Sequence, residues 1–350
     1  MDCLNNWPEP VVSVQTLSSL PYVQERYIRP PSQRPTTINN NNNHTIPTID
    51  LAGLKRGLDE ETMRTIGGAC REWGFFKVVN HGVDPDLMRL ARGVWREFFY
   101  QPIEEKRRYA NSPATYEGFG SRLGVEKGAI LDWGDYFFLH VLPERLKNPH
   151  KWPKLPSSCR EITEEYSKQL LKLCGFLMKV LSLNLGLGEE ELQKAFGGEK
   201  DIGACLRVNY YPKCPQPELT LGLSPHSDPG GFTLLYADDH VEGLQVRKND
   251  EWISVKPAPD SFIVNIADQI QILSNGIYKS VEHRVLVNSS QDRVSLAFFY
   301  NPKSDIPLGP FNELVTPERP ALYQPMTYDE YRLSIRKKGL KGKLLGETLK

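Results

Sequence analysis

The sequence lacks the segments that would carry it into or across a membrane. No stretch of its 350 residues approaches the run of about 18 apolar residues that a membrane-spanning helix needs. The first residues, MDCLNNWPEPVVSVQ, lack the basic and then apolar pattern of a secretory signal. The 6 cysteines show no C-x-x-C spacing and are expected to be free thiols. We therefore predict a cytoplasmic protein that also enters the nucleus by diffusion.

An excess of either charge is missing as well. Lys plus Arg and Asp plus Glu each number 43, so the formal net charge is zero. The protein then has no net field that would attract nucleic acid or an anionic membrane. We expect its partner to be a small neutral or mildly anionic molecule, and we predict no nucleic acid, no membrane and no obligate protein partner.

Composition divides the chain into four parts. Residues 1–45 are rich in Pro, Ser and Asn, which predicts an irregular, partly disordered N-terminal arm. Residues 46–200 predict a mixed region, with helices over 58–72, 84–99, 160–187 and 189–196 and short strands over 45–51 and 73–82. Residues 201–310 are rich in short β-type runs. Residues 311–350 predict a closing helix over 326–339 and a mobile basic tail.

The β-rich part favours an antiparallel double sheet. It consists of β-branched and aromatic runs separated by turn clusters at fairly regular spacing: CLRVNYY, GFTLLYA, GLQVR, EWISVKP, SFIVNIA, KSVEHRVLVN and RVSLAFFY. This cadence is typical of a barrel or jelly roll. The predicted fold class is therefore α+β, with a double-stranded β-helix (jelly-roll) core, supporting N-terminal helices and a C-terminal helix.

A candidate metal site lies in SPHSDPGG, residues 224–231. His226 and Asp228 are two residues apart, so in an extended segment their side chains lie on one face. The pair also fits a solvated turn, because Pro and Gly surround it. His283 completes a set of two histidines and one carboxylate, which is diagnostic of non-haem Fe(II) oxygenases and also occurs at catalytic zinc. The other histidines lack ligand-like partners and are predicted to be structural or exposed: His44, His81, His140, His150 and His240.

Arg293 and Ser295 indicate an anion close to this site. Their spacing of two again places both side chains on one face of a strand. An Arg inside a barrel is costly to bury unless an anion pairs with it, and Arg binds carboxylates in bidentate fashion. A carboxylate of the protein would serve as well as a bound ligand, so the residues alone leave both interpretations open.

Together these motifs resemble those of the plant Fe(II)/2-oxoglutarate-dependent dioxygenases, a class that includes anthocyanidin synthase. The resemblance rests on HSD at 226–228, His283, RVS at 293–295 and NYYPKCP at 209–215, and it extends to IPTIDL and WGFFKVVNHGV. It implies that Fe(II) is bound by His226, Asp228 and His283, and that 2-oxoglutarate is bound by Arg293, Ser295, Tyr211 and Asn209. It also implies O2 as a cosubstrate, ascorbate as a candidate reductant, and oxidation of a substrate C–H bond coupled to the formation of succinate and CO2.

Strand alternation adds candidate substrate residues. Arg207 is two residues before Asn209 and therefore faces the same interior. Because Arg293 serves the cosubstrate, Arg207 is left for an anion on the substrate. By the same alternation, Phe299 follows Arg293 into the barrel.

Further substrate residues come from outside these strands. Tyr136 and Phe138, in LDWGDYFFLH, match pocket positions in relatives of the anthocyanidin synthase type, although core packing explains them equally well. A second cation would come from the C-terminal helix, where Arg332 is preferred to Arg336. The result is an aromatic, apolar pocket with a cationic clamp, which suits a small hydrophobic acid.

The extended match is closest to the plant jasmonate-induced oxygenases. It includes WPEPVVSVQ, YEGFGSRLG, LDWGDYFF, ILSNGIYKSVEHRV and SLAFFYNPKSD. The resemblance implies hydroxylation of jasmonic acid to 12-hydroxyjasmonic acid, which lowers jasmonate defence signalling. Three alternatives stay open: a flavonoid oxidase of the anthocyanidin synthase or flavonol synthase type, a non-catalytic ligand sensor on the same scaffold, and a zinc hydrolase, which would leave Arg293 and Ser295 without a role.

Overall fold

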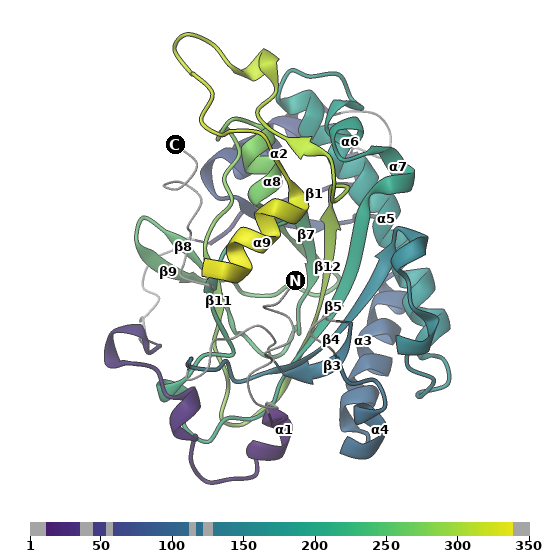
Figure 1. Ribbon diagram of the computed structural model, residues 1–350, viewed down its shortest axis with the longest axis vertical. Helices are drawn as coiled ribbons and strands as arrows, with labels where there is room; N and C mark the ends of the chain where they lie inside the picture. Colours follow the sequence, from purple (N-terminus) through teal and green to yellow (C-terminus); the bar gives the residue numbers. More distant parts are fainter. Residues whose placement is uncertain (1–11, 36–44, 54–58, 112–116, 122–128, 339–350) are drawn as a thin grey trace.

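Two β-sheets form the centre of the chain, as the computed structural model shows (Figure 1). The structure describes residues 12–35, 45–53, 59–111, 117–121 and 129–338, with side chains up to residue 335. The larger sheet has the order β1 (Thr48–Asp50), β2 (Phe75–Val79), β10 (Phe262–Ile266), β7 (Phe232–Tyr236), β12 (Arg293–Asn301), β5 (Gly203–Tyr211), β4 (Asp135–Leu142), β3 (Gly118–Ser121). The smaller sheet has the order β6 (Leu223–His226), β11 (His283–Val285), β8 (Leu244–Lys248), β9 (Glu251–Ser254).

Helices cover the outer face of the larger sheet, and a last helix lies near the opening between the sheets (Figure 1). The helices are α1 (Val14–Leu17), α2 (Glu60–Glu72), α3 (Pro85–Tyr100), α4 (Ile103–Arg107), α5 (Cys159–Asn184), α6 (Glu191–Ala195), α7 (Gly198–Asp201), α8 (Asp268–Leu273) and α9 (Tyr328–Lys338). A third, two-stranded sheet pairs β13 (Pro307–Leu308) with β14 (Met326–Thr327) just before α9. The predicted α+β class with a jelly-roll core is confirmed.

The two faces of strand β12 show how alternation separates chemistry from packing. Val294, Leu296, Phe298 and Tyr300 belong to the main hydrophobic core, whereas the alternate residues, beginning with Arg293, line an interior cavity. β12 pairs with β5 along its whole length, from Arg293 opposite Tyr211 to Asn301 opposite Gly203. This fixed register makes the two strands present their polar residues side by side.

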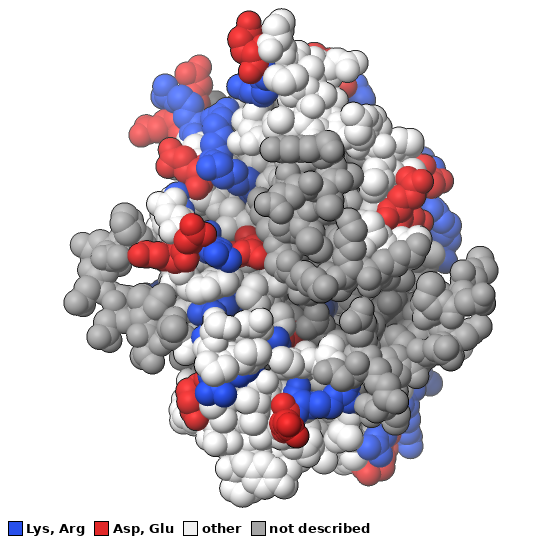
Figure 2. Space-filling view, turned by 60° about the vertical axis from the view of Figure 1, so that its left-hand side comes forward, with Lys and Arg blue, Asp and Glu red and all other residues white. Residues whose placement is uncertain are grey.

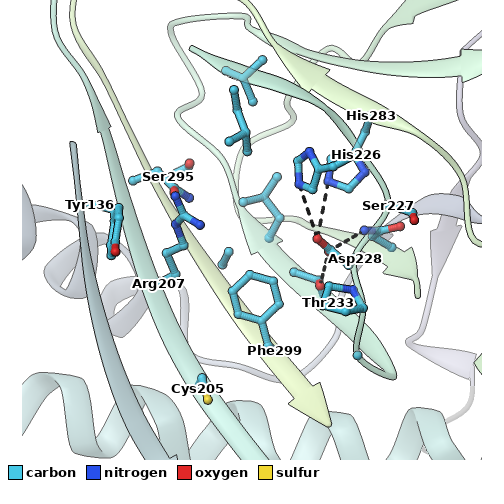
Figure 3. A pocket seen from close by; sticks show the side chains of 18 of the residues that line it. Tyr136, Cys205, Arg207, His226, Ser227, Asp228, Thr233, His283, Ser295 and Phe299 are labelled. Carbon is cyan, nitrogen blue, oxygen red and sulfur yellow. Dashed lines mark hydrogen bonds and ion pairs between the residues drawn. The ribbon is translucent and has the colours of Figure 1, made fainter. Parts of the chain in front are cut away.

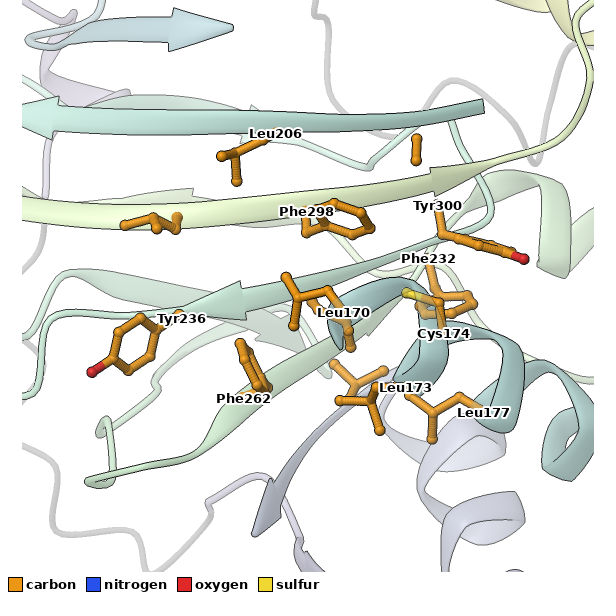
Figure 4. Close-up of a cluster of buried hydrophobic side chains, with 14 of the residues drawn as sticks. Leu170, Leu173, Cys174, Leu177, Leu206, Phe232, Tyr236, Phe262, Phe298 and Tyr300 are labelled. Carbon is orange, nitrogen blue, oxygen red and sulfur yellow. The ribbon is translucent and has the colours of Figure 1, made fainter. Parts of the chain in front are cut away.

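Helix α5 closes the core on the outer side of the larger sheet. Its apolar residues recur at intervals of three and four, so Tyr166, Leu170, Leu173 and Leu177 lie on one face and are buried. Figure 4 shows this face packed against Phe298 and other side chains of the sheet. The helix ends at Asn184, just before Gly186, whose φ of +78° is left-handed and favours glycine, so the predicted range of 160–187 extends slightly too far.

Most predicted elements are present at the expected places. The helices predicted over 58–72, 84–99, 160–187 and 189–196 are α2, α3, α5 and α6, and the closing helix is α9. The predicted strands near residues 48 and 75 are β1 and β2, and they join the same sheet as the strands from the 201–310 part. Helix α8 was not predicted. The asparagine run and the basic tail lie outside the described residues.

The N-terminal arm differs from its prediction, because residues 12–35 pack against the barrel. Val14, Leu17 and Tyr27 form a buried cluster with Trp133. The carboxylate of Asp135, from β4, accepts hydrogen bonds from the Ser13 hydroxyl and from the backbone N–H groups of residues 14 and 15, so it caps α1 from a distant strand. Composition describes only what a segment can bury by itself, and this arm packs on a surface supplied by the rest of the chain.

Charge on the exterior is mixed. On the face shown in Figure 2, Lys and Arg side chains alternate with Asp and Glu side chains. Across the part of the chain that the structure describes, no helix combines the length and apolar character required to cross a membrane.

Removing the Leu170 side chain tests the packing of α5. Leu170 is 0% exposed, so Leu170→Ala should leave a cavity and lower the free energy of unfolding by about 2–5 kcal/mol. Leu90→Ala is the matched control, because Leu90 lies on α3 and is 54% exposed, and its loss should change stability by no more than about 0.5 kcal/mol. Chemical denaturation of both variants measures the difference, and equal stabilities would contradict this packing.

Candidate active site

A cavity of about 390 Å³ lies between the two sheets and beside α9. Its size is within the range of about 300–1,000 Å³ that is usual for small-molecule sites. Its walls are mainly apolar and aromatic, with a few polar groups that converge from β4, β5, β6, β11 and β12. Such a lining can orient a small ligand through a small number of polar contacts.

The three predicted metal ligands meet on one side of this cavity. One ligand atom from each of His226, Asp228 and His283 lies within 4.8 Å of the others. The Nε2 atoms of the two histidines are 3.6 Å and 3.7 Å from Oδ1 of Asp228 (Figure 3). His226 and His283 are directly opposite each other where β6 pairs with β11, so the sheet itself brings the two rings together.

Backbone carbonyl groups orient both histidine rings. Nδ1 of His226 is 2.8 Å from the carbonyl oxygen of Ser224, and Nδ1 of His283 is 3.3 Å from that of Val281. A proton on each Nδ1 leaves the Nε2 lone pair free for a metal ion. Burial, reinforced by the neighbouring His283, lowers the pKa of His226 to about 3, so its ring is in the neutral, metal-binding form at neutral pH.

The carboxylate of Asp228 is held through its other oxygen. Oδ2 accepts hydrogen bonds from the Thr233 hydroxyl at 2.6 Å and from the Asn265 amide at 2.7 Å. Thr233 and Asn265 are partners in the pairing of β7 with β10, so this contact is built into the larger sheet. Burial by itself would raise the pKa of Asp228, but the histidines and these two hydrogen bonds lower it overall. The carboxylate is therefore ionised with Oδ1 turned toward the histidines.

Arg293 supplies a buried cation a short distance from the metal ligands. Its Nε donates to the carbonyl oxygen of Val241 at 3.2 Å, and one terminal nitrogen lies 3.4 Å from the Ser295 hydroxyl. Burial lowers the pKa of Arg293, but an arginine stays charged at neutral pH. Within the described residues, no carboxylate forms an ion pair with this guanidinium. The structural salt bridge left open by the sequence is thus not formed there, and an anionic ligand would fit.

Arg207 is a second cation inside the same cavity. Its guanidinium lies over the ring of Tyr136, 4.3 Å from the centroid, and its buried Nε has no hydrogen-bond partner among the described residues. Figure 3 shows Arg207 extending from β5 into the cavity, on the side opposite the metal ligands. The ring of Tyr136 thus supports the guanidinium of Arg207, and N–H groups of that guanidinium remain available to a ligand.

The register of β4, β5 and β12 orders the cavity from one end to the other. Tyr211 is opposite Arg293 and Asn209 is opposite Ser295, so the predicted cosubstrate residues form one group. Along the strands the next inward residues are Arg207 beside Phe138, followed by Phe299 beside Cys205. One wall therefore presents, in order, a first cation, a second cation and aromatic apolar surface.

Helix α9 contributes the remaining predicted residue. Arg332 lines the cavity together with Tyr328 and Ile335. Its guanidinium is 3.9 Å from the carboxylate of Asp329 and its side chain is 37% exposed, so this ion pair is loose. The side chain of Arg336 lies outside the described residues.

Every site residue predicted from the sequence lines this one cavity. The set comprises His226, Asp228, His283, Arg293, Ser295, Tyr211, Asn209, Arg207, Tyr136, Phe138, Phe299 and Arg332. The structure thus brings them together, while their individual binding roles remain predictions.

The sequence interpretation missed several cavity residues and misplaced one. His140 was predicted to be structural or exposed, yet it lines the cavity and its Nδ1 is 3.5 Å from Sγ of Cys205. Tyr136 and Phe138 were identified by resemblance, but His140 follows them at the same spacing of two on β4, so strand alternation could have found it. Thr233 and Asn265 gave no signal, because their roles depend on pairing between distant strands.

Comparisons with known proteins agree with this geometry. Residues 202–302 match the model of the 2OG-Fe(II) oxygenase superfamily, and residues 46–155 match that of the non-haem dioxygenase in morphine synthesis N-terminal family. Jasmonate-induced oxygenase 2 of Arabidopsis thaliana is 63% identical over 97% of this chain and 93% of its own length. Codeine O-demethylase of Papaver somniferum is 42% identical over 87% of this chain and 84% of its own.

Solved structures are similar over most of the chain. A crystal structure of JOX2 in complex with 2OG, Fe and JA has a TM-score of 0.90 and 62% identity, and covers 96% of this chain and 97% of that one. A dioxygenase for auxin oxidation in rice has a TM-score of 0.73 and 28% identity, and covers 87% of this chain and 98% of that one.

Substitution of Thr233 tests the support of the metal ligand. Thr233→Val keeps the shape of the side chain but removes the hydrogen bond to Asp228, so affinity for a divalent metal should fall by about tenfold. Titration of the metal-free protein with Co(II), followed by its absorption, measures this. Thr220→Val is the matched control, because Thr220 is fully buried and its hydroxyl has no hydrogen-bond partner in the part of the chain that the structure describes. Equal Co(II) affinities of the two variants would show that Thr233 does not support the site.

Proposed function

The chain belongs to the 2OG-Fe(II) oxygenase superfamily, and we propose that it hydroxylates jasmonic acid to 12-hydroxyjasmonic acid. It is an oxygenase that uses Fe(II) and 2-oxoglutarate. The observation that carries the choice of substrate is a half-buried cation in the cavity, Arg207, which the cosubstrate does not need.

The residues present fit the iron and its cosubstrate. Two histidines and one ionised carboxylate are a donor set that suits non-haem iron, and they would hold it at the wall of the cavity. Arg293 and Ser295 suit the distal carboxylate of 2-oxoglutarate, with Tyr211 beside them. When bound, iron and 2-oxoglutarate supply the oxidising power, by which O2 is consumed, succinate and CO2 are released and an oxygen atom enters a substrate C–H bond.

The protein's own contribution is positioning and exclusion of water. Arg293 and Ser295 would hold one end of the cosubstrate on β12 of the larger sheet, while His226 and His283 face the same cavity from the smaller sheet. Phe299 and Phe138 form an apolar wall beside Arg207 that an alicyclic acid can contact. The substrate is then fixed by its charge at one point and by its hydrocarbon body along the wall.

An acidic substrate explains Arg207 better than a neutral one does. A half-buried guanidinium loses part of its hydration, and the carboxylate of jasmonic acid would neutralise Arg207, assisted by Arg332. A flavonoid is a flat and neutral polyphenol that would leave Arg207 without an anionic partner. The relatives at 63% identity are named jasmonate-induced oxygenases, and JOX2 has been solved in complex with JA, which supports the same choice.

Product analysis tests the proposal directly. With Fe(II), 2-oxoglutarate, ascorbate and O2, the protein should convert jasmonic acid to a product one oxygen atom heavier and form succinate in equal amount, as measured by mass spectrometry. Methyl jasmonate is the matched control because a neutral methyl ester replaces its carboxylate, and we expect its kcat/KM to be at least about tenfold lower. A flavonoid oxidase would convert flavonoids with a higher kcat/KM than jasmonic acid. A ligand sensor would form no succinate, and the activity of a zinc hydrolase would not depend on O2.

Paired substitutions of the two cavity arginines test the division of the site. Arg207→Ala should lower kcat/KM for jasmonic acid by roughly 10²-fold or more, because it leaves the substrate carboxylate buried without its cation, while KM for 2-oxoglutarate stays within about threefold of wild type. Arg293→Ala should do the reverse and raise KM for 2-oxoglutarate by at least about tenfold. Steady-state kinetics with each substrate varied in turn measures both. Unchanged turnover of jasmonic acid by Arg207→Ala would refute the role of Arg207.

A further inference from the structure

Asp268, the first residue of α8, connects the metal-binding loop to the C-terminal helix. It is 1% exposed. One of its carboxylate oxygens, Oδ2, accepts hydrogen bonds from the Tyr331 hydroxyl at 2.8 Å and from the Ser227 hydroxyl at 3.2 Å. The other oxygen accepts a hydrogen bond from Ser280 at 2.6 Å. A single oxygen atom therefore connects Ser227 of the metal-binding loop with Tyr331 of α9, which are 104 residues apart in the sequence.

On one side, this carboxylate is fixed to the loop that carries the metal ligands. Ser227 stands between His226 and Asp228 in the sequence. The backbone N–H of Asp268 donates to the carbonyl oxygen of Asp228 at 3.0 Å, and that of Gln269 donates to Gly230 at 2.8 Å. The start of α8 and the metal-binding loop thus form one rigid unit.

On the other side, the carboxylate fixes helix α9. Tyr331 is 3% exposed. It packs with Ile272, which is on α8, and with Tyr323, which lies in the segment before α9. The next residue, Arg332, lines the cavity, where burial raises the pKa of Cys205 and the charge of the Arg332 guanidinium offsets part of that rise. Because the ion pair of Arg332 within its own helix is loose, its place in the cavity depends on where the helix lies.

We propose that Asp268 and Tyr331 are positioning residues for the substrate. Their hydrogen bond sets the distance from the Arg332 guanidinium, which binds the substrate anion, to the metal ligands. This distance determines which C–H bond of the substrate faces the metal. This inference rests on the proposed function in one respect, the binding of a substrate carboxylate by Arg332. A shift of the helix by a fraction of an ångström would move the substrate away from the productive geometry.

The chain offers a closely matched control for this bond. Tyr323 belongs to the same buried cluster, and its hydroxyl accepts a hydrogen bond from Gln271 of α8 at 2.9 Å. Tyr323 precedes α9 and does not line the cavity. Tyr331→Phe and Tyr323→Phe therefore each remove one buried tyrosine hydroxyl that bonds to α8, but only the first removes a bond next to Arg332 and linked to the metal-binding loop.

Binding and coupling measurements separate the two variants. With anaerobic iron-loaded enzyme and 2-oxoglutarate, calorimetry should show the Kd for jasmonic acid raised about 3- to 10-fold in Tyr331→Phe and less than about twofold in Tyr323→Phe. With O2 admitted, Tyr331→Phe should form more succinate than hydroxylated product, while its KM for 2-oxoglutarate stays at the wild-type value. Equal Kd values in the two variants would overturn the positioning role.

A double-mutant cycle with Arg332→Gln decides whether Tyr331 acts through Arg332. If it does, Tyr331→Phe should change the Kd for jasmonic acid by less than about twofold once Arg332 is already replaced. An effect of the same size in both backgrounds would overturn the inference and indicate a general structural role for Tyr331. Failure of the wild-type enzyme to bind jasmonic acid would instead overturn the proposed function, so the two failures are distinguishable.

Discussion

The burial of one ionised carboxylate is the constraint on which the rest of the site depends. Asp228 lies in a cavity where an unpaired charge would be costly, and Thr233 and Asn265 satisfy one of its oxygens while the two histidines face the other. This arrangement needs the pairing of β7 with β10 and of β6 with β11 at the same time. The metal ligands are therefore a product of both sheets, and neither sheet could form the site alone.

The two cavity arginines are stabilised in a similar way, by partners that offset the cost of removing them from water. Arg293 is satisfied in part by a backbone carbonyl and a hydroxyl, and Arg207 by the face of Tyr136. Each is stable enough to remain inside the barrel but retains donors for an anion. Two ligands, a dicarboxylate and a monocarboxylate, can thus be bound in one cavity without competing for the same group.

Local patterns and the family resemblance together predicted the site residues, and distant contacts explain what they missed. The spacing of two in HSD, in Arg293 with Ser295 and in Arg207 with Asn209 survives in the structure, because alternation is a property of any strand. The support of Asp228 and the packing of the N-terminal arm depend on strands and segments that meet only in the fold. Helix α8 is short and buried on all sides, so its apolar residues show no periodic pattern that would distinguish it from a strand.

The pairing of β12 with β5 has a consequence for folding fidelity. A slip of one residue between these strands would turn Arg293 and Ser295 toward the apolar layer under α5 and bring Phe298 into the cavity. The misaligned sheet would then bury charged and hydroxyl groups among hydrocarbon side chains, at a cost of several kcal/mol. The residues needed for chemistry therefore also disfavour a misaligned pairing of β12 with β5. An active molecule is then evidence that these two strands are in the correct register.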